Sequence, residues 1–358
     1  MRIGIDAREL CGKPTGVGRY LRWLLAEWAA NDYARGHEFV LYAPTLPPLT
    51  LDARRFGSRI VAGRLGAWWE QAALPTKIAR DHVDVFFSPG YTAPLALSIP
   101  TVVAIHDLSF FAHPEWFHVR EGLRRRWLTY QSAMRAHTVV TISEFSRREI
   151  VERLGLPPDR IRVIRPGTFV ARAALDRTSP RVLFVGSIFN RRRVPDLIRA
   201  FAHVAQASAR AHLDIVGDNR SFPREDLGAL IHTAGLADRA TWRSYVTDDE
   251  LQTLYGEARA FAFLSEYEGL GLTPLEALAA GVPPVLLDTP IARESCQDAA
   301  LYVQLGDVRG TARALELLLF DQATRSRLLA ASPRVLASFD GRAAARETLC
   351  AITCAAAS

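Results

Sequence analysis

The chain has 358 residues, of which 49% are hydrophobic and 23% are charged. That length exceeds the size at which a single hydrophobic core stops growing, so we expect two globular domains. No apolar run approaches the roughly 20 residues that a membrane-spanning helix needs. The N-terminal stretch MRIGIDAREL reads as a strand and lacks the apolar segment and cleavage site of a signal peptide. We therefore expect a cytosolic protein, or one that rests on the cytosolic face of the cytoplasmic membrane.

The positive charge of the chain lies in its N-terminal half. Residues 1–175 hold 24 Lys and Arg against 16 Asp and Glu, a net charge of +8, whereas residues 176–358 hold 20 against 22, a net charge of −2. An electropositive half attracts anions such as nucleic acid, acidic lipid headgroups or diphosphates. The four cysteines have no CxxC or Cys/His zinc spacing, so we expect free thiols in a reducing cytosol.

The first half alternates short apolar strands with helical stretches. Candidate strands lie at residues 2–7, 38–44, 59–65, 83–89, 101–109, 138–143 and 161–167. A helix is expected between the first two strands, because apolar residues recur there at helical spacing. These residues are Tyr20, Leu21, Leu24, Leu25 and Trp28. Strands rich in Val and Ile that alternate with helices predict a parallel sheet covered on both faces.

The alternation lapses after residue 167, and Ser179-Pro180 marks a break. We predict an N-terminal domain of residues 1–175, a C-terminal domain of residues 176–340 and a final helical segment of residues 341–358. In the second half, strands are expected at 181–187, 212–218, 240–246, 259–265, 283–288 and 300–304, and helices at about 194–209, 225–236, 248–257, 273–280, 309–319, 321–332 and 341–355.

The predicted fold class is α/β, with two doubly wound parallel sheets in tandem. Ligands bind at the strand C-termini of such open sheets, so we expect a ligand cleft between the two domains. The last helix has an apolar side formed by Ala344, Leu349, Ile352 and Ala355. It either caps the second domain or crosses back to the first.

The stretch EYEGLGLTPLE holds two acids, Glu268 and Glu276, around a glycine turn. We expect a helix to begin here with Thr273 as its N-cap and Pro274 at its first helical position. Free N–H groups at a helix start suit a phosphate, and Glu276 is placed to hold ribose hydroxyls. The alternative is that Glu276 only complements the helix dipole and that Glu268 is solvated.

Three arginines, Arg191, Arg192 and Arg193, stand at the turn after the first strand of the same domain. Guanidinium groups there can clamp a diphosphate by paired hydrogen bonds. The alternative is an exposed basic turn, and we expect one of the three to be only solvated.

In the N-terminal domain, Gly16 and Gly18 flank the start of a helix, which is another turn that suits phosphate. No third glycine completes GxGxxG, and no acid ends the second strand, so the pattern argues against NAD. His106 and Asp107 end a strand at the sheet edge, where either a functional or a structural histidine fits. No Asp-x-Asp, metal-ligand spacing or P-loop is present.

These motifs in this order resemble the retaining glycosyltransferases of family 4. The residues that carry the likeness are TGVGRY, HDLSFF, TISEFSRREI, VGSIFNRRRVPDLIRAF and YEGLGLTPLEALAAGVPPV. The last matches the family's pair of glutamates separated by seven residues. The resemblance spans nearly the whole chain and implies the GT-B fold of two Rossmann-like domains.

The resemblance also implies roles for single residues. The catalytic candidates are Glu268, His106, Arg191 and Arg192, with Glu268 on donor-sugar hydroxyls, both arginines on the diphosphate and His106 near the anomeric carbon. The donor-binding candidates are Gly16, Val17, Gly186, Ser187, Tyr245, Gly269, Leu270, Gly271, Leu272, Thr273 and Glu276. The acceptor-side candidates are Asp107, Trp116, Arg120 and Arg124. Arg193 departs from the family by standing where asparagine is common, and Leu270 replaces the usual phenylalanine.

The implied reaction moves a hexose from a nucleotide sugar to a hydroxyl of a glycan or a polyprenyl-diphosphate-linked glycan, with retained anomeric configuration and with no cofactor or metal. The likeness is closest to O-antigen mannosyltransferases, so GDP-mannose is the expected donor. UDP-glucose, UDP-galactose, UDP-N-acetylglucosamine and deoxysugar nucleotides stay open, as does a GT-B sugar-nucleotide epimerase. An oxidoreductase and a nucleic-acid binder lack their motifs.

Arginines interleave with aromatic residues over residues 113–138, and residues 66–75 add two tryptophans. That composition is typical of an interfacial helix on anionic lipid. The alternative is a core helix with a solvated basic face.

Overall fold

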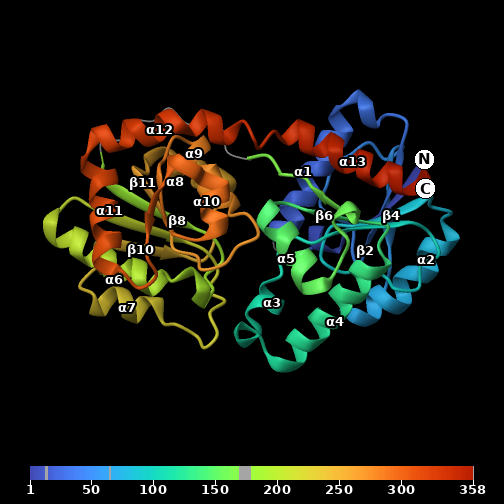
Figure 1. Cartoon of the computed structure of the whole chain (residues 1–358), viewed down its shortest axis with the longest axis horizontal. Coiled ribbons are helices and arrows are strands. Elements are labelled where there is room, and N and C mark those ends of the chain that lie inside the picture. The colour runs from blue at the N-terminus through green and yellow to red at the C-terminus, as the bar shows by residue number, and fades with distance from the viewer. Residues whose placement is uncertain (13–14, 64–65, 169–178, 358) are drawn as a thin grey trace. The chain divides into compact units, whose positions relative to one another are not determined.

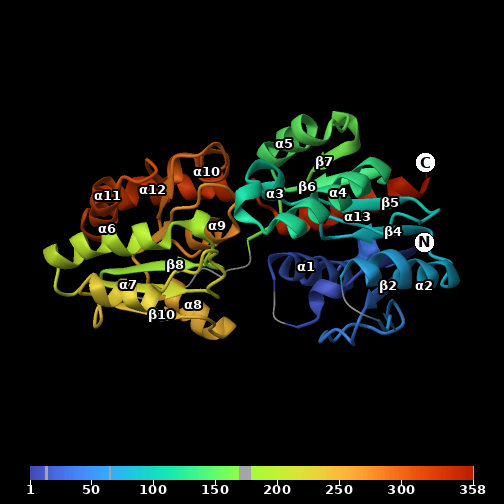
Figure 2. The same ribbon diagram turned by 90° about the horizontal axis from the view of Figure 1, so that it is seen from below.

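The computed structural model describes residues 1–12, 15–63, 66–168 and 179–357. The chain forms two compact units, one of Met1–Gly167 with Asp340–Ser358 and one of Thr168–Phe339. Each unit is a parallel sheet with helices on both faces (Figures 1 and 2). The break predicted at residue 175 falls in the stretch 169–178, which lies outside the described residues. The two units divide a few residues earlier, after Gly167.

The first unit has a seven-stranded sheet in the order β3-β2-β1-β4-β5-β6-β7. Its strands are β1 (Arg2–Asp6), β2 (Glu38–Ala43), β3 (Phe56–Ile60), β4 (Val85–Ser88), β5 (Thr101–Ala104), β6 (Thr138–Thr141) and β7 (Ile161–Val163). Its helices are α1 (Gly16–Ala30), α2 (Leu74–Arg80), α3 (Ser109–Ala112), α4 (Val119–Arg135), α5 (Glu144–Leu154) and α13 (Gly341–Ala357).

The prediction for the third strand was wrong in position. A strand was expected at residues 59–65, whereas β3 covers Phe56–Ile60 and residues 61–63 are not in a strand. Residues 64 and 65 lie outside the described residues. The register pairs Phe56 with Phe39 of β2, and the two rings stack at 4.8 Å with an angle of 6° between their planes. This buried aromatic pair sets the register, because cross-strand ring contacts stabilise neighbouring strands.

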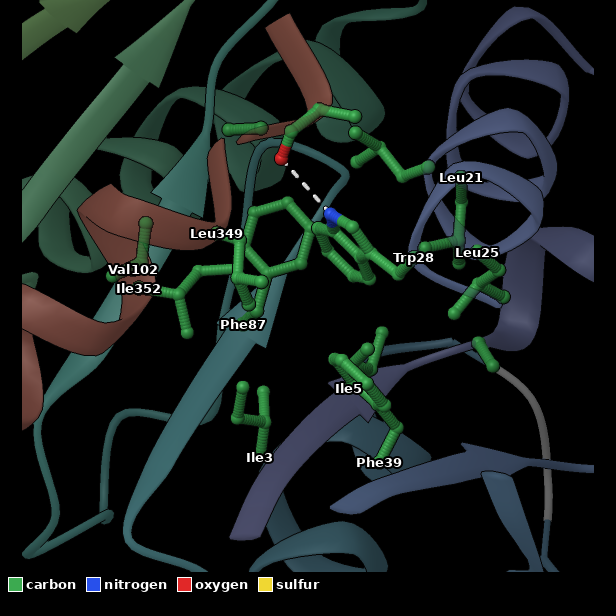
Figure 3. Close-up of a cluster of buried hydrophobic side chains, with 14 of the residues drawn as sticks. Ile3, Ile5, Leu21, Leu25, Trp28, Phe39, Phe87, Val102, Leu349 and Ile352 are labelled. Atoms are coloured by element: carbon green, nitrogen blue, oxygen red, sulfur yellow. Dashed lines mark hydrogen bonds between the residues drawn. The ribbon is translucent and has the colours of Figure 1, made fainter. Parts of the chain in front are cut away.

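Helix α13 packs in the first unit, against α1, β4, β5 and β6. Its predicted apolar side is confirmed as buried, and Leu349 and Ile352 lie among the core side chains in Figure 3. The indole Nε1 of Trp28, on α1, donates a hydrogen bond of 2.9 Å to the carbonyl oxygen of Ala345. Residues more than three hundred positions apart thus share one core.

The second unit has a six-stranded sheet in the order β10-β9-β8-β11-β12-β13. Its strands are β8 (Arg181–Val185), β9 (His212–Val216), β10 (Ala240–Arg243), β11 (Ala260–Phe263), β12 (Pro284–Leu287) and β13 (Leu301–Val303). Its helices are α6 (Val194–Ala207), α7 (Leu227–Thr233), α8 (Asp248–Glu257), α9 (Leu272–Ala279), α10 (Pro290–Cys296), α11 (Val308–Phe320) and α12 (Gln322–Leu336).

Both sheets reverse their strand order at one place. The first strand of each unit lies between its second strand and its fourth, so the reversal falls between β1 and β4 and between β8 and β11. Connections leave in opposite directions at such a switch point, and ligands bind beyond the carboxyl ends of the strands there. We therefore expect a ligand-binding site at the loops that follow these four strands.

Candidate functional site

An ion pair lies at the switch point of the second unit. Arg192 lies in the turn after β8, and Glu268 lies in the loop after β11. Two hydrogen bonds join them, from Nε to Oε1 at 2.8 Å and from Nη2 to Oε2 at 3.2 Å. The two side chains are only 14% and 16% exposed. A bidentate pair of this kind fixes the planes of both groups.

Glu268 and Arg192 each make a further hydrogen bond outside the pair. Ser265 Oγ donates a hydrogen bond of 2.8 Å to Glu268 Oε1, and Arg192 Nη1 donates one of 2.8 Å to the carbonyl oxygen of Ser187. The guanidinium also lies 4.9 Å from the ring centroid of Phe263, a cation–π distance. Ser265 is 6% exposed and was not among the predicted site residues. Its place two residues beyond a strand end was the only sequence signal for it.

Gly186 makes room for this arrangement. Its φ is +147°, and a Cβ at this position would lie 2.5 Å from Nη1 of Arg192. A side chain here would push the guanidinium away, so the glycine supports Arg192 directly.

The glycine loop after β11 ends in helix α9, but not as predicted. The helix begins at Leu272, and its N-cap is Gly271 with φ +83°, so the prediction of Thr273 as N-cap was wrong. Glycine adopts this left-handed conformation without the penalty of a Cβ, which explains why it takes the position. Thr273 and Pro274 are therefore the second and third residues of the helix, so the prediction of Pro274 at the first helical position was also wrong. Leu270, just before the N-cap, is 2% exposed.

Glu276 is fully buried, with an exposed fraction of 0%. The hydroxyl of Tyr255 donates a hydrogen bond of 3.2 Å to its Oε2. The alternative that Glu268 is solvated is wrong, because Glu268 is paired with Arg192.

The other two arginines of the turn are engaged as well. The guanidinium of Arg191 lies 4.4 Å from the ring centroid of Phe189. Arg193 has φ +50° and donates from Nε to Asp196 Oδ2 at 2.7 Å. The expectation that one of the three arginines is only solvated was wrong. Helix α6 begins directly after Arg193, and Asp196 in its first turn accepts the hydrogen bond from Arg193. The left-handed φ also explains the asparagine common at this position in the family, since asparagine tolerates that region well.

Tyr245 is not part of the cluster around Arg192 and Glu268. It follows β10 and is 67% exposed. Within the described residues, no hydrogen bond or ring contact joins it to the Arg192–Glu268 pair.

In the first unit, His106 follows β5 and lies between two tyrosine rings. The centroids of Tyr20 and Tyr91 are 5.1 and 5.7 Å from that of His106, and both contacts are edge-on. His106 Nε2 lies 2.7 Å from the carbonyl oxygen of Pro89, and because a carbonyl only accepts, Nε2 carries the proton. Burial lowers the pKa of His106, so the ring is neutral at neutral pH with a lone pair on Nδ1.

Asp107 is fixed by its neighbours. The hydroxyl of Tyr91 donates to Oδ2 at 2.7 Å, and the backbone N–H of Ser109 donates to Oδ1 at 2.8 Å. Asp107 therefore orients Tyr91, which in turn borders His106.

Gly16 and Val17 form the first turn of α1, where the side chain of Thr15 accepts a hydrogen bond from Gly18 N. A Cβ at Gly16 would meet nothing within 4 Å, whereas one at Gly18 would lie 2.3 Å from the carbonyl oxygen of Glu9. Gly18 is thus required by packing, and Gly16 leaves the helix start open.

The remaining acceptor-side candidates gather on and before α4. Trp116 stacks on His113 at 3.9 Å, and Arg124 Nη2 pairs with Glu121 Oε2 at 2.6 Å. Arg120 is exposed. These contacts join each residue to its own neighbours along the chain and not to His106.

A buried charge cluster at the switch point of the first unit escaped the sequence analysis. Arg8 lies just beyond β1, and its Nη2 pairs with Asp6 Oδ2 at 2.5 Å and with Glu70 Oε2 at 2.6 Å. Thr92 donates a further hydrogen bond to Glu70. The two carboxylates raise the pKa of Arg8 against the lowering effect of its burial, which is the largest single influence on it. The Asp-x-Arg spacing after the first strand was the signal that could have found it.

Across the described ranges, no cluster of His, Cys, Asp and Glu has the makings of a metal site. None of the helices in those ranges combines the length and apolar character that crossing a bilayer requires.

Known proteins resemble this chain over most of its length. The family model of group 1 glycosyl transferases matches residues 168–334, and that of Glycosyltransferase Family 4 matches residues 14–172. O-antigen chain mannosyltransferase B of Escherichia coli is 26% identical over 294 residues, which are 78% of this chain and 73% of that protein. A GDP-mannose:cellobiosyl-diphosphopolyprenol alpha-mannosyltransferase of Xanthomonas oryzae pv. oryzae is 28% identical over 302 residues, 74% of this chain and 76% of that protein.

Among solved structures, a sucrose-phosphate synthase of Thermosynechococcus elongatus matches with a TM-score of 0.82 over 100% of both chains, at 19% identity. At that identity the likeness shows the fold, which is GT-B, as the sequence predicted. With two family models that together span residues 14–334, the chain belongs to the group 1 and family 4 glycosyltransferases.

Proposed function

We propose that this glycosyltransferase moves a mannosyl group from GDP-mannose to a hydroxyl of a lipid-linked glycan during polysaccharide assembly, and that the anomeric configuration is retained. The observation that carries the proposal is the Arg192–Glu268 pair, held at the β8/β11 switch point beside the start of α9. The pair supports the proposal because it joins a cation that suits a diphosphate to an acid that suits sugar hydroxyls.

In the proposed reaction, the bond between the anomeric carbon and the diphosphate oxygen breaks, and the acceptor oxygen bonds to that carbon on the same face. The acceptor proton passes to an oxygen of the leaving diphosphate. Arg191, Arg192 and the N–H groups of Leu272 and Thr273 stabilise the charge that develops on the leaving group, which is electrostatic catalysis. These groups take the place of a divalent metal, so we propose that the reaction needs neither a metal nor a cofactor.

Two further roles follow for the donor. Glu268 exchanges part of its contact with Arg192 for hydroxyls of the sugar when the diphosphate takes the guanidinium. Glu276 binds the ribose, which requires its carboxylate to become accessible beside Tyr255. His106 offers the Nδ1 lone pair to the substrate, since its Nε2 is engaged by Pro89.

The choice of mannose and of a diphosphopolyprenol-linked acceptor is supported by the names of the two relatives above. The guanine base is proposed from these relatives alone, so UDP-linked and deoxysugar donors are the second candidates. We also propose that the protein works on the inner face of the cytoplasmic membrane, where a lipid-linked acceptor is presented.

The test is a panel of nucleotide sugars, with release of GDP or UDP followed with and without a lipid-linked acceptor. We expect acceptor-dependent release of GDP from GDP-mannose that persists in EDTA, and an α-linked product by NMR. Release without any acceptor would favour an epimerase-type use of the fold. An inverted anomer would overturn the retaining mechanism, and loss in EDTA would overturn the metal independence.

A further inference from the structure

Helix α4 of the first unit carries large apolar side chains on its outer surface. They are Val119 (76% exposed), Leu123 (55%), Trp127 (57%), Tyr130 (39%) and Met134 (39%). Successive members are four, four, three and four residues apart, and at 3.6 residues per turn they fall within an arc of about 80°. We call this continuous surface the α4 stripe. Figure 1 shows α4 at the lower edge of the first unit.

The stripe is not the side by which α4 packs. The buried residues of the helix are smaller and lie on the opposite side: Gly122, Leu128, Thr129, Ser132 and Ala133. A surface helix ordinarily buries its apolar side and presents polar residues to water. Here the bulkier apolar side is the one left outside, and exposed apolar surface of this extent marks an interaction site.

Positive charge borders the stripe on both sides. By the helical geometry, Arg126 lies about 20° beyond one edge, and Arg120 lies about 20° beyond the other. The helix has five arginines and a single acid, Glu121, whose carboxylate is bonded to Arg124 and Arg125 at 2.6 and 2.7 Å. The acid is therefore neutralised, and the surface around the stripe is cationic.

We propose that the α4 stripe docks on the headgroup layer of an anionic lipid bilayer. A helix lying in this layer inserts its apolar side chains, with Trp and Tyr at the level of the headgroups, while arginines on its flanks bind phosphates. A second copy of the chain fits less well, because a symmetric contact would bring the flanking Arg120 and Arg126 of both copies together.

A neighbouring tryptophan extends the surface. Trp68 is 56% exposed, and a Cβ built at nearby Gly66 would lie 3.9 Å from Nη1 of Arg124. Gly66, which directly precedes the helical turn that bears Trp68, therefore lies beside Arg124 of α4. The proposal rests on the proposed function in one respect: docking brings the first unit to the surface that carries a lipid-linked acceptor.

The test is co-sedimentation with phosphatidylglycerol-containing vesicles and with pure phosphatidylcholine vesicles. We expect binding to the anionic vesicles only, weakening as salt rises from about 0.01 M to about 1 M and the screening length falls from roughly 30 to 3 Å. Leu123→Ser with Trp127→Ser should lower the affinity at least tenfold, and Arg126→Gln should lower it severalfold. The matched control is Leu317→Ser with Phe320→Ser on α11, where the side chains are 42% and 51% exposed, and it should bind like the parent.

Equal binding to neutral vesicles, or an equal loss in the control, would overturn the proposal. So would a dimer of the parent chain that the stripe variant converts to a monomer. GDP binding by calorimetry should be unchanged in the stripe variant, which shows that it is folded. If the protein transfers sugar to a soluble acceptor but does not bind vesicles, the docking proposal alone is wrong. If it binds vesicles but transfers no sugar, the proposed function alone is wrong.

Discussion

Arg192 and Glu268 are 76 positions apart in the chain and are joined by two hydrogen bonds of 2.8 and 3.2 Å. In the proposed function, Arg192 receives the diphosphate and Glu268 the sugar, and without donor the two neutralise each other. The proposal therefore requires donor binding to exchange one anion for another at the Arg192 guanidinium. Repulsion between Glu268 and an incoming diphosphate follows from the same closeness.

Glu268→Gln removes that competing charge while preserving the shape of the side chain. We expect GDP to bind more tightly, by up to about tenfold or roughly 1.4 kcal/mol, because Arg192 is no longer paired with a carboxylate. Turnover should fall by about a hundredfold or more if the acid supports the reacting sugar. Calorimetry and initial rates measure the two effects.

The matched control is Glu266→Gln, since this nearby acid pairs with Arg193 at 3.8 Å. It should leave both quantities close to those of the parent. Weaker GDP binding in Glu268→Gln would count against the competition between carboxylate and diphosphate.

Glu276→Gln tests the proposed ribose contact at a fully buried site. We expect KM for the donor to rise about tenfold with little change in kcat, because the contact is the same in the ground state and the transition state. Tyr255→Phe serves as the comparison, since it removes the hydroxyl that bonds to Glu276 and keeps the ring. It should cost about 1 kcal/mol in the free energy of unfolding and change KM less. A fall in kcat alone would reject the ribose role.

Gly186→Ala should displace Arg192, because the new Cβ would lie 2.5 Å from its Nη1 and the residue has φ +147°. The strain should cost about 1–3 kcal/mol in the free energy of unfolding. Donor turnover should fall by more than that loss of stability explains. The control is Gly235→Ala, where φ is +69° and a Cβ would meet nothing within 4 Å. If both variants retain the same activity, Gly186 does not support Arg192.

His106 should make the first unit sensitive to acid. Burial lowers the pKa of His106 below its ordinary value, so between the two pKa values the unfolded chain binds a proton that the folded chain does not. This contribution to stability is complete above about pH 6.5, the ordinary value, and is lost as the pH falls below it. His106→Gln should therefore flatten the dependence of the unfolding free energy on pH, as measured by urea unfolding. An unchanged dependence on pH in His106→Gln would contradict the assignment.

Several elements could be predicted from the sequence because the signal lies within a few residues. The apolar faces of α1 and α13 follow from helical spacing, and every residue assigned to them is buried. The strands that are followed by glycine or polar loops were also predicted, because that signal too lies within a few residues. The position of β3 was wrong because the stack of Phe56 on Phe39 decides it, and Phe39 lies in another strand. The predicted N-cap of α9 was wrong because Gly271, with its left-handed φ, is the N-cap despite the capping preference of Thr273.

The amino-acid sequence by itself determined the alternation of strands and helices, and it determined the order of motifs by which the glycosyltransferase family and its GT-B fold are recognised. Both are local properties, written in periodicity and in short stretches. Only the tertiary structure decided that α13 returns to the first core, that Arg192 is paired with Glu268, and that the α4 stripe faces outward. Each depends on which distant surfaces meet, and periodicity does not distinguish an apolar side that packs on a sheet from one that is left exposed.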